Sequence, residues 1–132
     1  MFTKNPILVF SIEKLEFNMS IQSQYGLSFN KTMNSNGDLI PFVSQINRIG
    51  YNSVLTLISL INIQECQSFI RDLDRCINEK GNIDEGFFSD SVENRTILYN
   101  YPNVIIDDLF TIPMVDLKHL LGEWLSFINS IN

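Results

Sequence analysis

Hydrophobic and polar positions alternate with a helical period near the C-terminal end, over about residues 115–131. At 100° per residue, seven apolar side chains of this stretch fall on one stripe. They are Leu117, Leu120, Leu121, Trp124, Leu125, Ile128 and Ile131. Polar residues, among them Asp116, His119 and Glu123, take the opposite side. A stripe this wide predicts an amphipathic helix that covers the hydrophobic core, with the single tryptophan at its centre.

A second helical stripe covers about residues 63–80, and it begins after Asn62 and ends at Gly81, both typical capping residues. Its apolar members are Cys66, Phe69, Ile70, Leu73, Cys76 and Ile77. The run that precedes this helix, Ser53–Ile61, is apolar and rich in β-branched residues. We therefore predict a central strand over Ser53–Ile61 that is covered on both faces.

Shorter patterns predict the remaining elements. Asn34–Asp38 is a turn signal, and a short helix is expected over Pro41–Ile49 because Gly50 would end it. Residues 81–94 have no period and indicate a loop. Strands are predicted at Ile7–Ile12, Glu16–Ser23, Leu27–Thr32, Arg95–Tyr101 and Val104–Ile112. These elements predict a single α+β domain over residues 1–132, with a mostly antiparallel sheet and two long amphipathic helices (about 63–80 and 115–131) packed on it.

The charge pattern narrows the class of partner. The net charge of −6 argues against nucleic acid, because phosphate binding needs clustered lysine and arginine. Residues 61–132 hold twelve acids against five bases, whereas residues 1–60 are close to neutral. This asymmetry indicates either an acidic face that suits a basic partner or surplus carboxylate that keeps the protein soluble.

The cysteines and the apolar runs indicate the compartment. Cys66 and Cys76 are ten residues apart on one helix, a separation of about 15 Å that excludes a disulfide between them. Two unpaired thiols on a core-facing stripe favour a reducing environment. No stretch has the length of a membrane span or the pattern of a targeting signal. We therefore expect a cytoplasmic protein with no membrane partner.

Catalytic signals are weak. The single histidine, His119, lies on the polar side of its helix with Asp116 and Glu123 one turn away. This is the pattern of a solvated helix face, and no nucleophile motif accompanies it. The two cysteines and one histidine do not form a four-ligand metal set, and the glycines do not form a phosphate loop. The sequence predicts no catalytic residues, no metal and no cofactor; an enzyme that uses His119 is the third-ranked hypothesis.

One segment combines aromatic and acidic residues. Phe87 and Phe88 are consecutive in the polar stretch Ile83–Glu93, and carboxylates surround them at Asp84, Glu85, Asp90 and Glu93. Either the rings pack beneath the loop, or they form an exposed anchor whose flanking charges attract a basic partner. Four residues of the next two predicted strands would widen this partner-binding surface: Tyr99, Tyr101, Asp107 and Asp108. In a strand, Asp107 and Asp108 would point to opposite faces.

The stretch Phe110-Thr-Ile-Pro-Met-Val-Asp-Leu-Lys-His-Leu-Leu-Gly-Glu-Trp-Leu-Ser-Phe-Ile128 resembles a known pattern. It is similar to the C-terminal end of small immunity proteins from bacterial polymorphic-toxin and contact-dependent growth inhibition systems. Those proteins often finish with a strand, an Ile-Pro-Leu-like turn, and a helix that ends in Glu-Trp and apolar residues. The resemblance implies a cytoplasmic, acidic, single-domain protein that neutralises a toxin by direct binding. It implies no binding residues, because these families share no binding motif.

Charge and resemblance together predict an immunity or inhibitor protein. We expect it to bind a basic toxin, for example a nuclease, and to occlude the active site of that toxin. The alternative is a non-catalytic structural or adaptor domain that assembles with itself or with a larger complex through an exposed strand edge. The sequence leaves the oligomeric state open.

Overall fold

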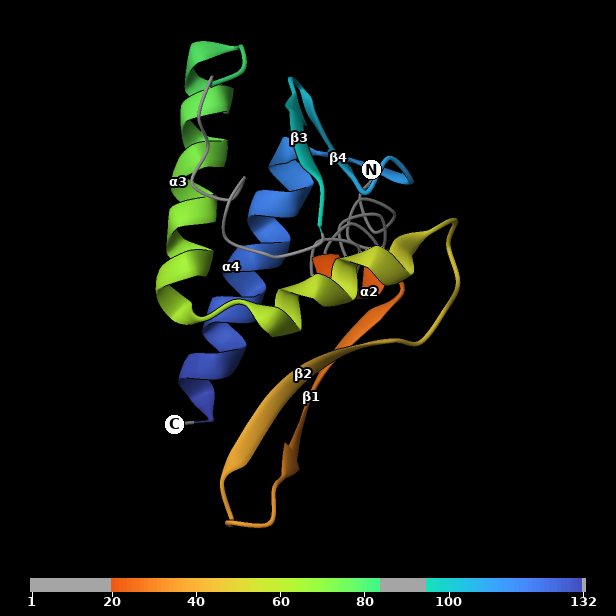
Figure 1. Ribbon diagram of the computed structural model, residues 1–132, viewed down its shortest axis with the longest axis vertical. Coiled ribbons are helices and arrows are strands. Elements are labelled where there is room, and N and C mark those ends of the chain that lie inside the picture. The colour runs from red at the N-terminus through yellow and green to blue at the C-terminus, as the bar shows by residue number, and fades with distance from the viewer. Residues whose placement is uncertain (1–19, 84–94, 132) are drawn as a thin grey trace, which may run out of the picture.

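The computed structural model describes residues 20–83 and 95–131, and it is α+β (Figure 1). The elements are α2 (Ile21–Gln24), β1 (Leu27–Met33), β2 (Leu39–Gln45), the 3₁₀ helix η1 (Asn52–Leu60), α3 (Ile63–Glu79), β3 (Ile97–Asn100), β4 (Asn103–Ile106), β5 (Phe110–Pro113) and α4 (Met114–Ser130). The strands form two small antiparallel sheets, β1-β2 and β3-β4-β5, where the sequence predicted one. The predicted strand Ile7–Ile12 lies outside the described residues.

The two long helices form the centre of the fold. Figure 1 shows α3 and α4 side by side, and most of the apolar stripe of each helix is buried, with Ile70, Ile77, Leu125 and Ile131 half-buried. The Trp124 ring packs edge-on against Phe29 of β1, with ring centroids 5.1 Å apart. Asn62 and Glu65 form a capping box at the start of α3, as the sequence indicated for Asn62. The helix ends with Lys80 in the left-handed conformation, one residue earlier than predicted.

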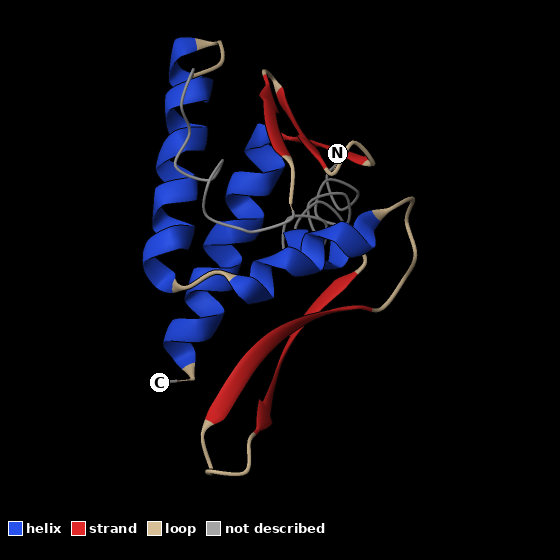
Figure 2. Cartoon of the chain, viewed as in Figure 1, coloured by secondary structure: helices blue, strands red, loops and turns tan. Residues whose placement is uncertain are grey.

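The prediction of a central strand over Ser53–Ile61 is wrong. Asn52–Leu60 forms the 3₁₀ helix η1, which packs against β2 (Figure 2). Its side chains Val54, Leu55, Leu57 and Ile58 are buried. A short, continuous apolar run satisfies a buried helix as well as a buried strand, so periodicity alone does not separate the two.

The short helix predicted over Pro41–Ile49 is also wrong, because Leu39–Gln45 is the strand β2. β2 pairs with β1 in a register that sets Phe29 opposite Val43 and Lys31 opposite Pro41. The N–H groups of Phe29 and Val43 donate to side chains outside the hairpin, Gln22 Oε1 and Ser59 Oγ. Residues two apart in a strand point their N–H groups the same way, so position 41 also faces away from β1. Pro41 therefore removes no hydrogen bond of the ladder.

Two further predictions need correction. In the described part of Glu16–Ser23, Ile21–Gln24 is a helical turn and not a strand. The predicted strand Val104–Ile112 is divided into β4 and β5 by a turn in which Asp107 and Asp108 both have positive φ, 55° and 56°. Asp107 and Asp108 therefore do not alternate across a strand.

Candidate partner-binding surface

The turn at Asp107 is bonded directly to the start of β3. The Asp107 N–H donates to the Thr96 carbonyl at 2.8 Å, and the Asp107 carboxylate accepts the Thr96 N–H at 3.0 Å. The same carboxylate forms an ion pair with Arg95 at 2.7 Å. The turn and the residue that follows segment 84–94 therefore lie together.

The electrostatics of this junction pair Arg95 with Asp107. The Thr96 N–H holds the pKa of the Asp107 carboxyl below its ordinary value, and Arg95 adds to this effect against a smaller opposing effect of burial. The Arg95 charge is thus balanced by Asp107. The neighbouring Asp108 is exposed, and segment 84–94 contains four acids and no lysine or arginine.

The two predicted tyrosines join β3 to α3 and are half-buried. The Tyr99 hydroxyl donates to Asp72 Oδ2 at 2.9 Å, and burial raises the pKa of Tyr99 well above its ordinary value. The Tyr101 N–H donates to Asn82 Oδ1 at 2.6 Å. Both residues therefore have structural contacts of their own. Six predicted contact residues lie outside the described residues: Asp84, Glu85, Phe87, Phe88, Asp90 and Glu93.

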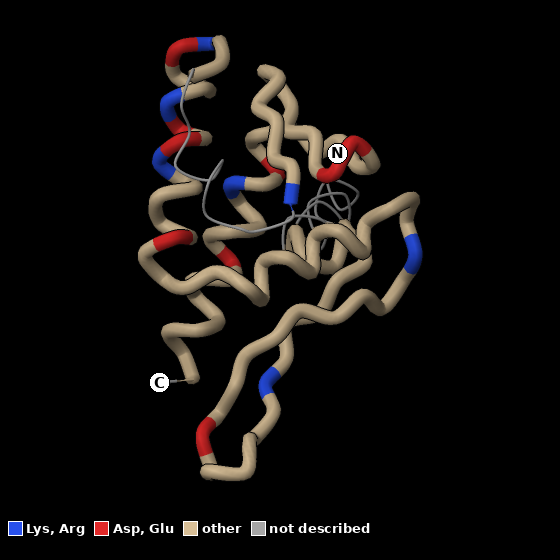
Figure 3. Tube along the Cα trace, viewed as in Figure 1, with Lys and Arg blue, Asp and Glu red and all other residues tan. Residues whose placement is uncertain are grey.

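Other acids of the second half are engaged within the protein. Glu123 accepts the N–H groups of Ile21 and Gln22, both at 2.9 Å, and Asp116 accepts the Tyr25 hydroxyl. The carboxylate of Asp74 pairs with the Lys118 ammonium. Along α3, acidic and basic positions are interspersed (Figure 3). Among the described residues, therefore, the acids of the second half do not form one uniform acidic face.

The described residues offer little for catalysis. His119 is exposed, and its neighbours Asp116 and Glu123 bond to the α2 region instead. Both thiols are buried, and burial raises the pKa of Cys66 to about 12, so the reactive thiolate is disfavoured. No group of histidine, cysteine or carboxylate residues in the described ranges could hold a metal ion. In the same ranges, no helix is both long and apolar enough to cross a membrane.

Comparisons with known proteins found no relative of this chain. No family model matches the chain, and neither the curated proteins nor the solved structures gave a significant match.

The contacts of Arg95 and Thr96 with Asp107 were not anticipated from the sequence. A signal was present, because consecutive aspartates tolerate the left-handed conformation and favour turns. With a turn placed at Asp107-Asp108, antiparallel pairing of the strands on either side would have been expected. The pairing of the turn with Thr96 depends on the register of β3 and β4, which sets Ile97 opposite Ile106.

Proposed function

We propose that this protein is an inhibitor that binds a basic partner protein, and specifically an immunity protein that neutralises a bacterial toxin in the cytoplasm. The proposal depends on one observation: the Asp107 carboxylate balances Arg95 at 2.7 Å, where segment 84–94 joins β3. The base that follows this segment in the sequence is therefore paired within the protein, and we assign the attraction of the partner to the four carboxylates of the segment and to Asp108.

Uncompensated carboxylates attract a basic surface over a distance of about 10 Å at moderate ionic strength. A nuclease active site is basic because it holds phosphate, so carboxylates can take the place of its substrate. Phe87 and Phe88 would supply the apolar contact that slows dissociation, because buried aromatic side chains dominate the energy of many interfaces. The C-terminal resemblance to immunity proteins supports the same class.

The proposal predicts a toxin gene immediately beside this gene, and the test uses the toxin domain that such a gene encodes. We expect the two purified proteins to form a complex and the toxin activity to be lost at equimolar inhibitor. The variant Glu93→Gln/Asp108→Asn should bind at least tenfold more weakly. The control Asp38→Asn/Glu79→Gln removes the same charge elsewhere and should bind as the wild type does. Equal binding by both variants, or full toxin activity in the presence of excess protein, would refute the proposal.

The alternative, self-assembly through a strand edge, is favoured by the exposed cross-strand pair Met33 and Leu39 at the tip of the β1-β2 hairpin. Two features of the same hairpin oppose it. Pro41 offers no N–H on the outer edge of β2, and Lys31 places a charge on β1. Light scattering separates the proposals, because a stable oligomer at micromolar concentration would favour assembly and a monomer would favour inhibition.

A further inference from the structure

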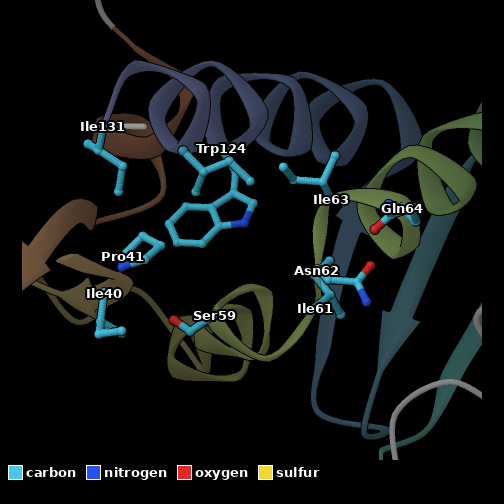
Figure 4. A pocket seen from close by; sticks show the side chains of 10 residues that line it. Ile40, Pro41, Ser59, Ile61, Asn62, Ile63, Gln64, Trp124 and Ile131 are labelled. Atoms are coloured by element: carbon cyan, nitrogen blue, oxygen red, sulfur yellow. The ribbon is translucent and has the colours of Figure 1, made fainter. Parts of the chain in front are cut away.

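A groove of about 380 Å³ lies at the opposite end of α4 from the Asp107–Asp108 turn, between α4, β2 and the junction of η1 and α3 (Figure 4). We call it the Trp124 groove. Its lining residues are Ile40, Pro41, Ser59, Ile61, Asn62, Ile63, Gln64, Trp124, Ile128 and Ile131. The volume falls within the range of small-molecule sites. None of the lining residues carries a charge.

The walls of the groove are fixed by contacts of three of its lining residues, Ser59, Asn62 and Trp124. Ser59 Oγ accepts the Val43 N–H at 2.7 Å, which fixes η1 against β2. The capping box of Asn62 and Glu65 fixes the start of α3. The Trp124 ring packs edge-on against Phe29 and stacks on Phe127, with the centroids of the stacked rings 5.9 Å apart. The elements that form the groove are therefore held in place by the fold.

One polar group of the groove has no partner. Trp124 is only 2% exposed, and no described residue accepts a hydrogen bond from its Nε1–H. Burial of an unpaired donor is unfavourable, because the donor loses its hydrogen bond to water. An acceptor atom from a bound molecule would remove this penalty. The exposed Gln64 side chain, which takes no part in the capping box, can turn and admit such an atom to the buried Nε1.

The polarity of the groove changes from one end to the other. In Figure 4 the nitrogen edge of the indole faces the side of Asn62 and Ile63, whereas its six-membered ring faces Pro41. The side chains of Asn62 and Gln64 line this end of the groove, and Asn62 uses its Oδ1 in the capping box. The far end is apolar, with Ile40, Pro41 and Ile131.

We infer that the Trp124 groove binds a small, neutral molecule with an aliphatic chain and an amide head. The amide carbonyl accepts from Trp124 Nε1, and the amide meets the side chains of Asn62 and Gln64. The chain lies along Pro41, Ile40 and Ile131. A carboxylate of the same length is disfavoured because the lining supplies no cation to balance it.

The tryptophan is the only one in the chain, so its fluorescence reports directly on the groove. Titration with hexanamide, octanamide and decanamide should give saturable changes, with affinity rising about fourfold per methylene. Octanoate should bind at least tenfold more weakly than octanamide. The absence of a saturable change up to the solubility limit, or equal affinity for the amide and the carboxylate, would overturn the inference.

Two variant pairs locate the site. Ile40→Arg places a charge at the apolar end and should abolish binding, whereas Leu60→Arg, exposed beside the groove but outside its lining, should leave binding unchanged. Octanol has the same chain length as octanamide but no amide group. Gln64→Leu should lower the ratio of the affinity for octanamide to the affinity for octanol. By calorimetry, Trp124→Phe should lower octanamide affinity about tenfold, the effect of one lost hydrogen bond. Equal binding by the Ile40→Arg and Leu60→Arg variants would place the ligand elsewhere and contradict the inference.

Discussion

The carboxylate of Glu123, on α4, accepts the backbone N–H of Ile21 at 2.9 Å across 102 residues of sequence. Its second oxygen accepts the N–H of Gln22. Glu123 thus satisfies two of the donors that the short helix α2 leaves unpaired at its N-terminus. A residue expected on a solvated helix face instead fixes the first described element to the last helix.

Glu123→Ala should lower the free energy of unfolding by about 2 kcal/mol, because two charge-assisted hydrogen bonds are lost. Urea denaturation measures the change. The matched control is Glu79→Ala, which removes an exposed carboxylate that pairs with Arg75 at 3.7 Å. We expect a change below about 0.5 kcal/mol for the control. Equal losses in the two variants would show that the Glu123 contacts contribute nothing.

Gly26 and Gly122 should respond to alanine in opposite directions. Gly26 has φ +70°, and an added Cβ would lie 2.5 Å from the Asn47 carbonyl oxygen. Gly26→Ala should therefore destabilise by more than about 2 kcal/mol. Gly122 lies within α4 with no atom within 4 Å of an added Cβ. Gly122→Ala should stabilise by about 0.5–1 kcal/mol, and thermal unfolding of both variants tests the pair.

The buried side chain of Asn52 fixes the loop before η1. Its Nδ2 donates to the carbonyls of Tyr25 and Asn47 at 2.8 and 2.9 Å, and its Oδ1 accepts the Ile49 N–H at 3.1 Å. Asn52→Asp would set a carboxylate oxygen against two carbonyls and should destabilise by about 3 kcal/mol or more.

The control for this prediction is Asn36→Asp, an exposed position in the β1-β2 turn, where the change should be below about 0.5 kcal/mol. Chemical denaturation at neutral pH compares the two variants. A small effect at position 52 would mean that the loop finds another arrangement without the amide.

The pH dependence of the stability of the Asp107→Asn variant tests the pairing of Asp107 with Arg95. Because the pKa of Asp107 is lowered in the native state, its charge adds stability above the pKa of the unfolded chain, about 4. That stability is lost as the pH falls through the lower native pKa. Asparagine tolerates the positive φ but cannot pair with Arg95. The variant should melt below the wild type at pH 7, and the difference should shrink as the pH falls below about 4 and through the lowered native pKa; a difference that stays constant as the pH falls would contradict the assigned pairing.

The long helices could be predicted from the sequence because their stripes and caps agree. The stripe of α4 around Trp124 and the Asn62 cap of α3 are local signals, and packing reinforces them. The strand β1 was also predicted, as Leu27–Thr32, within one residue of its observed end.

The errors arose where tertiary contacts override local preference. Ser53–Ile61 forms a 3₁₀ helix whose start is fixed by Asn52 through bonds to Tyr25, 27 residues away. Pro41 suggested a helix start. In the strand, however, Pro41 lies opposite Lys31 at a position that faces away from β1, so it removes no hydrogen bond of the ladder. In the candidate site, the neutralisation of Arg95 by Asp107 depends on strand register, which residue types alone did not indicate.

The central claim is that uncompensated carboxylates guide this protein onto a basic toxin. Its most direct test is the association rate constant with the toxin whose gene we expect beside this one, measured by stopped flow from 20 to 500 mM salt. We expect the rate constant to fall at least tenfold over this range. The wild type should lose this dependence when Asp84, Glu85, Asp90 and Glu93 are all neutralised. A rate constant that is independent of salt, and equal in the wild type and the neutralised variant, would contradict the account.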